Sequence, residues 1–418
     1  MKSLLLITHG YPINNSEDDC FIKNEIPFIY RYFEKIYILS LFRNINNEEI
    51  LNLPNNVIFY IFDKYYSKVK KLITSIIILL NPIFYYELIL LIKNKNISIK
   101  KIFYCISYLR DGILLKKNIN KILNKDKNIN LIYTFWFLQE TLSALLIKKE
   151  RKNIYCITRA HGYDVHEFQN SLKYQPFKYW MDKKIDKIFF ASQYLCDYYL
   201  KTFAKSNINK YIPMPLGLIN NKTSNVINKK RNMNTFILCS CSYIIPRKRI
   251  NFIIEALNQI NDFNIHWIHI GNGPDMENII SLSYSLLHNK NNISFEFKGF
   301  MTSEQVMIFY EKNHIDCFIT TADMEGGRPV SISEAMSFGI PVIATNTGGI
   351  PELVKDIGIL LDNNCKISEI RKAITNFYNL SEIEKNNIRH STRCFWENNC
   401  KAETNYTNFI KELGNLIN

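Results

Sequence analysis

Two glutamates flank a glycine-rich turn in the stretch EGGRPVSISE, which runs from residue 325 to residue 334. Eight residues separate Glu325 from Glu334, and Gly326 and Gly327 stand among them. Adjacent glycines let the backbone turn its N–H groups outward, where they can bind an anion or a hydroxyl group. Carboxylates beside such a turn can accept hydrogen bonds from vicinal hydroxyl groups, as a ribose presents them. The stretch indicates a polar binding site.

Glu334 also has a purely structural interpretation. Ser331 stands three residues before it, and Ser-x-x-Glu at a helix start is a capping box in which the glutamate satisfies a backbone N–H. A second Gly-Gly turn follows in NTGGIPELV, before a helix that a proline would open. Two such turns on adjacent strands would frame one polar cleft. The residues alone leave both interpretations of Glu334 open.

Three cationic residues, Arg247, Lys248 and Arg249, immediately precede the apolar stretch INFIIEAL. Cations at a helix N-terminus oppose the helix dipole, which costs stability unless an anion binds there. A bound diphosphate would remove the conflict, whereas solvated surface cations would need no such explanation.

The stretch GNGPD, residues 271–275, ends another predicted strand. Gly273 permits close backbone approach, and Pro274 suits a first helical position. An ordinary strand-to-helix turn explains the stretch equally well. Met276 stands where a G-x-G-x-x-G fingerprint needs glycine, which disfavours a nicotinamide enzyme.

In the first half, RAHGYDVHE gathers His161, Asp164, His166 and Glu167 after a strand. No partner cluster with ligand spacing occurs elsewhere in the sequence, and Asp-x-Asp is absent from it, so we expect neither a metal ion nor a cofactor. His161, beside a glycine, is the candidate active-site group, with a structural histidine as the alternative. Gly10, in THGYP, could meet the same ligand across an interdomain cleft.

Short apolar strands that alternate with helical stretches must position these loops. We predict strands at 4–8, 36–41, 57–62, 131–135, 154–158 and 187–192, and a second series at 235–240, 265–271, 293–299, 316–321 and 340–345. Such alternation predicts an α/β fold of two parallel sheets wrapped by helices. Ligands of these sheets bind beyond the carboxyl ends of the strands, where the loops described above lie.

A chain of 418 residues exceeds what one core usually supports, which favours two domains. The polar stretch 220–234 is typical of a linker, and we place the boundary near residue 218. Ten cysteines without a CxxC pair favour a reduced, cytoplasmic setting. The start MKSLLLITHG is interpreted as a first buried strand rather than a signal peptide.

Residues 61–130 hold 14 Lys or Arg against 4 Asp or Glu and so carry +10 of the net charge of +14. They include the apolar stretch 72–92, which Asn81, Pro82 and Glu87 interrupt. We predict two apolar helices, the second opened by Pro82. Core helices, a surface on an anionic inner membrane and a spanning helix remain alternatives. Nucleic acid is disfavoured because the charge is mixed with long Ile/Leu runs.

These motifs together resemble the family 4 retaining glycosyltransferases of the GT-B fold, of the type that makes bacterial cell-surface polysaccharides. The resemblance runs nearly end to end and is most specific in EGGRPVSISEAMSFGIPVIATNTGGIPELV. It implies two Rossmann-like domains facing a cleft: an acceptor-binding domain at 1–218, a domain that binds the nucleotide-sugar donor at 219–380, and final helices at 381–418 that cross back. It also implies no metal.

The resemblance assigns roles to individual residues. Lys248 matches the lysine that neutralises the donor diphosphate, with Arg249 assisting. Glu334 matches the glutamate that binds the ribose, and Glu325 the one that faces the donor sugar. Further donor-site positions are Gly10, Gly273, Phe300 at the base, His161 beside the sugar, and Gly326, Gly327, Arg328, Pro329 and Val330, whose backbone would orient the sugar.

The sequence departs from the family pattern in two places. The family usually has seven residues between its glutamates, whereas eight occur here. Tyr243 stands where the family usually has an arginine, which shifts one expected phosphate contact to Arg247 or Arg249.

The resemblance implies transfer of a hexose from a UDP- or GDP-sugar to a saccharide acceptor, which is expected to be lipid-linked. We expect a cytoplasmic protein, peripheral on the inner membrane through residues 61–130. A nucleotide-sugar epimerase with the same two-domain architecture is the alternative enzyme. A non-catalytic protein that binds membranes or nucleic acid is the alternative outside enzymes.

Overall fold

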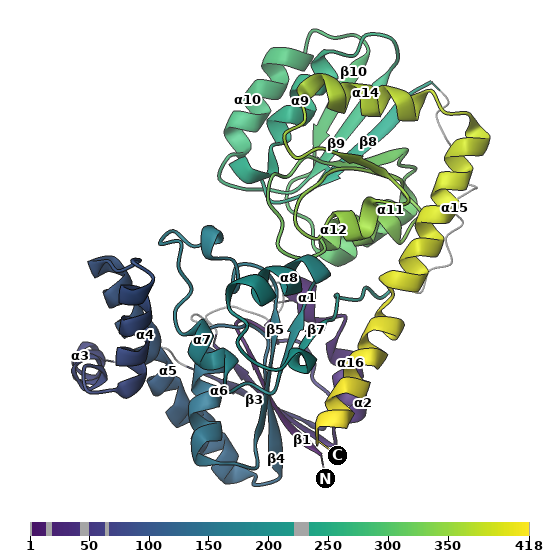
Figure 1. Ribbon diagram of the computed structural model, residues 1–418. Coiled ribbons are helices and arrows are strands. Elements are labelled where there is room, and N and C mark those ends of the chain that lie inside the picture. Colours follow the sequence, from purple (N-terminus) through teal and green to yellow (C-terminus); the bar gives the residue numbers. More distant parts are fainter. Residues whose placement is uncertain (1, 14–18, 42–49, 63–66, 221–233, 418) are drawn as a thin grey trace. The chain divides into compact units, whose positions relative to one another are not determined.

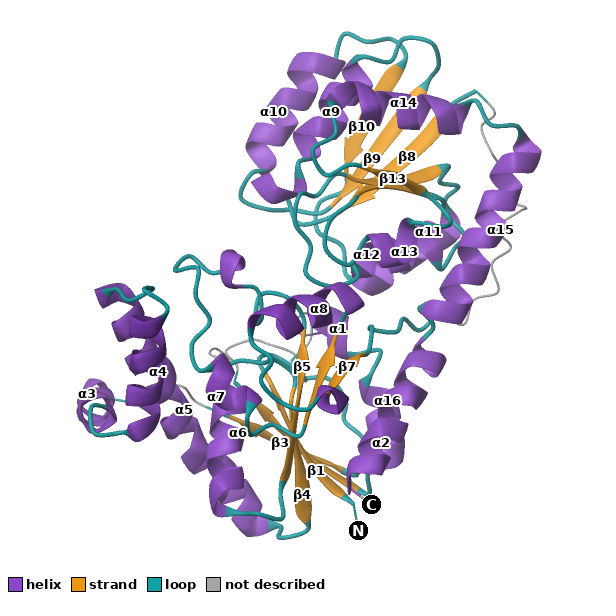
Figure 2. Cartoon of the chain, in the orientation of Figure 1, coloured by secondary structure: helices purple, strands orange, loops and turns teal. Residues whose placement is uncertain are grey.

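The computed structural model describes residues 2–13, 19–41, 50–62, 67–220 and 234–417. The chain forms two compact units, one of Met1–Met214 with Tyr406–Asn418 and the other of Pro215–Asn405 (Figure 1). Each unit contains a parallel sheet with helices on both faces (Figure 2). The predicted α/β class with two parallel sheets is confirmed. Most of the predicted linker, residues 221–233, lies outside the described residues.

The first unit is built on a seven-stranded sheet with the order β3-β2-β1-β4-β5-β6-β7. Its strands are β1 (Ser3–Thr8), β2 (Lys35–Ser40), β3 (Val57–Ile61), β4 (Ile129–Thr134), β5 (Tyr155–Ala160), β6 (Lys187–Phe190) and β7 (Tyr211–Pro213). Its helices are α1 (Asp19–Ile22), α2 (Ile26–Tyr32), α3 (Lys68–Ile78), α4 (Pro82–Lys93), α5 (Ile99–Lys125), α6 (Gln139–Glu150), α7 (Lys178–Asp182) and α8 (Gln193–Thr202).

The second unit is built on a six-stranded sheet with the order β10-β9-β8-β11-β12-β13. Its strands are β8 (Phe236–Cys241), β9 (Ile265–Ile270), β10 (Ile293–Phe297), β11 (Cys317–Thr320), β12 (Val342–Thr345) and β13 (Ile359–Leu361). Its helices are α9 (Ile250–Asn258), α10 (Met276–Leu287), α11 (Ser303–Lys312), α12 (Val330–Met336), α13 (Pro351–Val354), α14 (Ile367–Tyr378) and α15 (Glu382–Asn399). The last helix, α16 (Ala402–Ile417), begins in this unit and belongs to the first unit from Tyr406.

All eleven predicted strands occur, with ends that differ by at most two residues. Two edge strands, β7 and β13, were not predicted. Each has only three residues, too few to show an apolar run. The central strands were easy to predict because parallel strands covered on both faces are apolar throughout, as in β1, where every residue is buried.

The strand order of each sheet reverses at one point, between β1 and β4 in the first unit and between β8 and β11 in the second. The loops after these strands diverge to opposite sides of the sheet, which leaves a crevice at the carboxyl ends. Loops with predicted site residues follow β1, β8 and β11, and His161 follows β5, the strand next to β4. The folds therefore place the candidate chemistry where α/β sheets commonly bind ligands.

The unit boundaries differ from those drawn on the sequence. The structure divides the chain after Met214 and again after Asn405, whereas the sequence placed boundaries at 218 and 380. Helix α15 belongs to the second unit because Arg389 donates hydrogen bonds to the backbone oxygens of Ile315 and Asp316 before β11. The end of α16 belongs to the first unit, where Phe409 stacks against the guanidinium of Arg159 at 4.8 Å.

Candidate active site

The structure brings Lys248 and Glu325 together where the second sheet reverses its strand order. Lys248 ends a short 3-10 helix, Pro246–Lys248, in the loop after β8, and Glu325 lies in the loop after β11. The Lys248 ammonium donates a hydrogen bond to Glu325 Oε1, and both side chains are mostly buried. Partial burial strengthens such a pair because little water screens the two charges. Two residues 77 positions apart thus form one charged centre.

Hydrogen bonds between backbone and side chains fasten these two loops together. The Asp323 backbone N–H donates to the Arg247 oxygen at 3.0 Å. The Thr321 hydroxyl donates to the Arg249 oxygen at 2.8 Å. The charged centre therefore stands on a connected backbone frame, as preorganised electrostatics requires.

Arg249 serves this frame. Its guanidinium donates to the backbone oxygens of Thr321, Ala322 and Asn363 and to the Asn363 side chain, which occupies four of its five N–H groups. The expectation that Arg249 assists the diphosphate is therefore not supported by its geometry. Arg247 is exposed, and one of its N–H groups lies 3.4 Å from the Met324 oxygen.

The two Gly-Gly turns of the second unit lie directly against each other. A Cβ atom on Gly348 would lie 1.7 Å from the Glu325 oxygen, and one on Gly349 would lie 2.6 Å from the Gly327 oxygen. Only glycine allows this approach, because any side chain would collide with backbone. The Gly326–Gly327 turn after β11 is therefore in direct contact with the Gly348–Gly349 turn after β12.

The remainder of the turn is fixed by Arg328 and Pro329. The Arg328 side chain donates to Glu352 of α13 at 3.0 Å, so its guanidinium braces the turn. Pro329 is the N-cap of α12, and Val330 is its first residue. The backbone from Gly326 to Val330 is the part of this segment that remains suited to orienting a sugar.

Glu334 lies in α12, where it is buried, and its Oε1 accepts a hydrogen bond from the Ser303 hydroxyl. The capping box with Ser331 does not form, because α12 begins at Val330 and its N-cap makes no side-chain hydrogen bond. The predicted capping box is therefore wrong, and the role of Glu334 in binding the ribose stays a prediction. Ser303, the first residue of α11, stands three positions after Phe300 and was missed by the sequence interpretation.

Gly273 and Phe300 lie in loops after neighbouring strands, β9 and β10. A Cβ atom on Gly273 would lie 2.2 Å from the Ile244 oxygen, so this glycine lets two loops pack closely. Phe300 is 68% exposed. An exposed aromatic ring at the carboxyl end of a sheet is a suitable stacking surface for a base.

In the first unit, His161 and Gly10 follow β5 and β1. The His161 ring lies 4.5 Å from the Trp136 ring and 4.8 Å from the Phe135 ring, and its Nε2 lies 3.0 Å from the Phe135 oxygen. The sequence interpretation missed His9, which stacks on Trp136 at 5.8 Å and contacts Glu140 Oε1 through Nε2 at 3.0 Å. Two histidines and one tryptophan thus gather at the carboxyl ends of β1, β4 and β5.

The residues after His161 do not converge on one point. The Asp164 carboxylate accepts hydrogen bonds from the backbone N–H groups of Phe137, His161 and Gly162. His166 is buried among aromatic rings. Among the residues that the structure describes, no three His, Cys, Asp or Glu side chains come together as metal ligands.

His166 gives a testable pH dependence. Its ring lies 4.5 Å from Phe168 and 4.6 Å from Tyr198, and neither of its nitrogens has a hydrogen-bond partner within the described structure. Burial lowers the His166 pKa from 6.5 to about 4, against an opposing effect of Asp164. The unfolded chain therefore takes up the proton first as the pH falls from 6.5 to 4, which removes up to about 3 kcal/mol of stability.

We expect His166→Phe to abolish this contribution. Urea titrations at pH 6.5 and at pH 4 give the free energy of unfolding of wild type and variant. Relative to the variant, wild type should be more stable at pH 6.5 than at pH 4. His269, whose pKa burial also lowers to about 4, is present in both proteins, so its contribution cancels. An equal difference at the two pH values would contradict the assignment.

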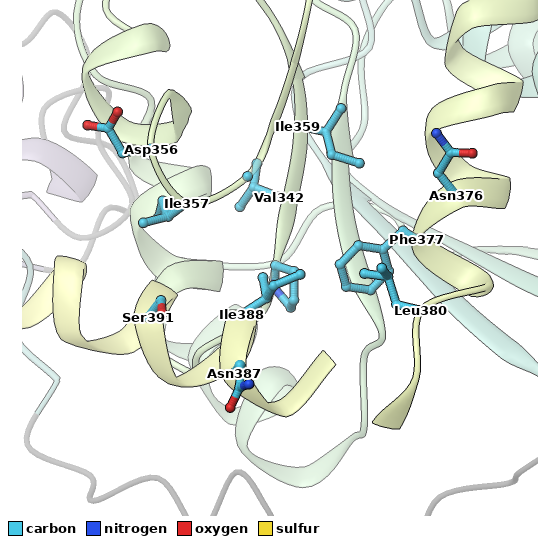
Figure 3. Close-up of a pocket in the computed structure, with 12 residues that line it drawn as sticks. Val342, Asp356, Ile357, Ile359, Asn376, Phe377, Leu380, Asn387, Ile388 and Ser391 are labelled. Atoms are coloured by element: carbon cyan, nitrogen blue, oxygen red, sulfur yellow. The ribbon is translucent and has the colours of Figure 1, made fainter. Parts of the chain in front are cut away.

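A cavity of about 420 Å³ lies elsewhere in the second unit (Figure 3). Its lining includes Val342 and Ile359, the first residues of β12 and β13, with Phe377 of α14 and Ile388 of α15. The cavity therefore lies at the amino ends of the strands, away from the loops that hold Lys248 and Glu325. Its lining is mainly apolar, so we do not assign it to the chemistry.

The chain is similar to a glycosyltransferase family and to individual proteins. Residues 221–393 match the family described as glycosyl transferases group 1. An uncharacterized glycosyltransferase of Methanocaldococcus jannaschii is 28% identical over 310 residues, which cover 72% of this chain and 80% of that protein. Protein CapJ of Staphylococcus aureus is 24% identical over 360 residues, which cover 82% of this chain and 79% of CapJ.

Among solved structures, Anabaena Alr3699/HepE in complex with UDP and glucose aligns with a TM-score of 0.65 and 15% identity, over 99% of this chain and 100% of that one. Two parallel-sheet units in this arrangement of strands define the GT-B fold. Together with the match of residues 221–393, this fold identifies the protein as a glycosyltransferase with the GT-B architecture.

Proposed function

We propose that the protein transfers a hexose from a UDP- or GDP-sugar to a saccharide acceptor and retains the configuration at the anomeric carbon. The observation that carries the proposal is the Lys248–Glu325 pair at the switch point between β8 and β11. An ammonium group in a mostly buried position suits a diphosphate, and the neighbouring turns offer backbone N–H groups to sugar hydroxyls. The UDP and glucose bound by Alr3699/HepE support this choice of donor.

The proposed roles follow the placement of each residue. Lys248 and Arg247 neutralise the departing diphosphate, and Glu325 both orients Lys248 and faces the donor sugar. Glu334, held by Ser303, accepts the ribose hydroxyls. Phe300 stacks on the base. His161 and Gly10, on the first unit, would meet the donor sugar, whereas Arg249 and Arg328 hold the loops that carry these groups.

In the proposed reaction the bond between the anomeric carbon and the diphosphate oxygen breaks while the acceptor oxygen bonds to the same face of that carbon. The departing phosphate oxygen takes the proton of the acceptor hydroxyl, so no separate protein base is required. Stabilisation of the developing negative charge by Lys248 supplies the main catalytic effect. No metal ion is needed in this scheme.

We further propose a lipid-linked acceptor, a cytoplasmic location at the inner membrane, and a role in capsule or O-antigen synthesis. The putative colanic acid biosynthesis glycosyltransferase WcaL of Salmonella typhimurium is 31% identical over 128 residues, 28% of this chain and 30% of WcaL, and the role in its name supports a polysaccharide as the product.

The test is a transfer assay with purified protein, a panel of UDP- and GDP-hexoses and a lipid extract that contains glycolipids. We expect one donor to release its nucleoside diphosphate only when the extract is present, and NMR of the product to show the anomeric configuration of the donor. A new nucleotide-sugar isomer formed without extract would indicate the epimerase instead. No turnover of any donor would contradict the proposal.

A further inference from the structure

Helix α3 and the turn after it expose an unusual amount of apolar surface. We name this set of side chains the apolar ridge; its members are Val69, Leu72, Ile73, Ile76, Ile77, Leu79 and Leu80, all of them exposed. Leu80, at the tip, is 83% exposed. Large contiguous apolar patches are rare on surfaces that contact only water, so the ridge indicates a binding partner.

The ridge exists because α3 gathers most of its apolar side chains on a face that stays exposed and buries only a narrow stripe. Thr74 and Ile78, four positions apart and therefore one turn apart, are its only buried residues. Helices α3 and α4 lie beyond α5, on the side away from the sheet (Figure 1). The other faces of α3 therefore have no described element to cover them.

Helix α4 fixes the ridge to the unit. Asn81 caps α4 by accepting a hydrogen bond from the Ile83 N–H at 2.9 Å. Phe84, Glu87 and Leu91 are buried, and Glu87 accepts a hydrogen bond from the Tyr174 hydroxyl. The predicted break at Asn81–Pro82 is confirmed, with α3 and α4 bent by 67°. Helix α4 therefore anchors the end of the ridge to the first unit.

No single helix in the described part of the chain is long and apolar enough to cross a bilayer, although α3 and α4 pass that test as a bent pair. The buried face of α4 argues against insertion of the pair as a span, because it would have to leave Tyr174 and the core. Tyr85, Ile89 and Ile92 on the exposed face of α4 add to the exposed apolar surface. This shape suits a helix that lies in a membrane surface.

The charges around the ridge select the kind of surface. Exposed lysines occur along this part of the chain: Lys68 and Lys70 lie on α3 itself, and Lys93, Lys95 and Lys100 lie between the end of α4 and the start of α5. Between residues 67 and 110 the one carboxylate is Glu87, which is buried. An apolar surface on a lysine-rich segment without exposed carboxylates complements a bilayer with anionic headgroups, where each lysine near the surface adds attraction.

We propose that the apolar ridge inserts into the headgroup region of an anionic bilayer and docks the first unit on it. The first turns of α5 connect this surface to the segment that follows His161: the Asn170 amide donates to the Tyr104 hydroxyl at 3.4 Å, and the Lys101 ammonium lies 5.6 Å from the Tyr174 ring. The inference rests on the membrane location proposed above, to which it assigns a surface, and it does not depend on the identity of the donor.

The test is cosedimentation of the full chain with vesicles of phosphatidylcholine alone or mixed with phosphatidylglycerol. We expect binding to the mixed vesicles that weakens with added salt. The triple variant Leu72→Ser, Ile76→Ser and Leu80→Ser should reduce this binding at least about tenfold. Ile383→Ser, which removes an exposed isoleucine of the second unit, is the matched control and should bind as wild type does.

Equal binding by the triple variant and wild type, or no binding by wild type at low salt, would overturn the proposal. If wild type binds no vesicles but forms a dimer in light scattering, and the triple variant is a monomer, the ridge contacts a second copy of the chain. That result would equally overturn the proposal. Donor binding by the triple variant should stay at the wild-type level, and Lys248→Ala should still bind vesicles. Failure of the membrane proposal can therefore be distinguished from failure of the proposed reaction.

Discussion

Lys248→Ala is expected to lower kcat about 100- to 1,000-fold, the usual consequence of removing one group that stabilises charge in a transition state. The Lys248 ammonium lies at the β8–β11 switch point, where it donates a hydrogen bond to Glu325. Without it, the charge that develops on the diphosphate is left without its main counter-charge. Steady-state kinetics with the donor identified in the transfer assay measures the effect.

Two further variants separate the charge from the fold. Lys248→Arg keeps the charge but changes its geometry, so an intermediate activity is expected. Lys372→Ala removes an exposed lysine of α14 and should leave kcat unchanged. A Lys248→Ala protein with a native near-ultraviolet circular dichroism spectrum and normal kcat would exclude Lys248 from the chemistry.

Glu334→Gln is expected to raise the donor KM about 10- to 100-fold. Hydrogen bonds to a charged group contribute about 1.5–3 kcal/mol each, and the glutamine loses that charge while keeping the shape. The Ser303 hydroxyl can still donate to the glutamine oxygen, so the buried position remains satisfied. Titration of donor concentration in the transfer assay separates this effect from a change in kcat.

Ser303→Ala provides the companion variant, because it keeps the carboxylate but removes the hydroxyl that orients it. We expect a rise in donor KM smaller than that of Glu334→Gln. A Glu334→Gln protein that melts several degrees lower but binds donor normally would show that Glu334 serves the fold alone.

The sequence predicted the architecture well because parallel strands bury both faces and so appear as uninterrupted apolar runs. The helix break at Asn81–Pro82 was equally predictable, because proline fits the first position of a helix and asparagine is a common N-cap residue. The strands β7 and β13 and the unit boundaries could not be drawn correctly from local pattern. Whether α15 packs on one unit or another depends on long-range contacts, such as that of Arg389 with the Ile315 oxygen.

Within the candidate site, residue types indicated which loops matter but not how each side chain is used. Arg249 and Lys248 are adjacent in a cationic run, yet one is bound to three backbone oxygens and the other faces a carboxylate. The residue pattern cannot predict these different roles, because they depend on the backbone conformation. Arg249 has a left-handed backbone, with φ of 46°, which directs its side chain differently from that of Lys248. The capping box failed because Pro329, not Ser331, is the N-cap of α12.

The central claim is that the loops after β8 and β11 bind a nucleoside diphosphate through Lys248 and Glu334. Thermal unfolding of wild type, Lys248→Ala and Glu334→Gln with UDP, GDP and their sugars tests it most directly, since a ligand that binds the folded state raises the apparent Tm. We predict that one nucleotide series raises the wild-type Tm and that both variants lose most of that rise. An equal rise in all three proteins, or no rise in wild type with any nucleotide, would contradict the claim.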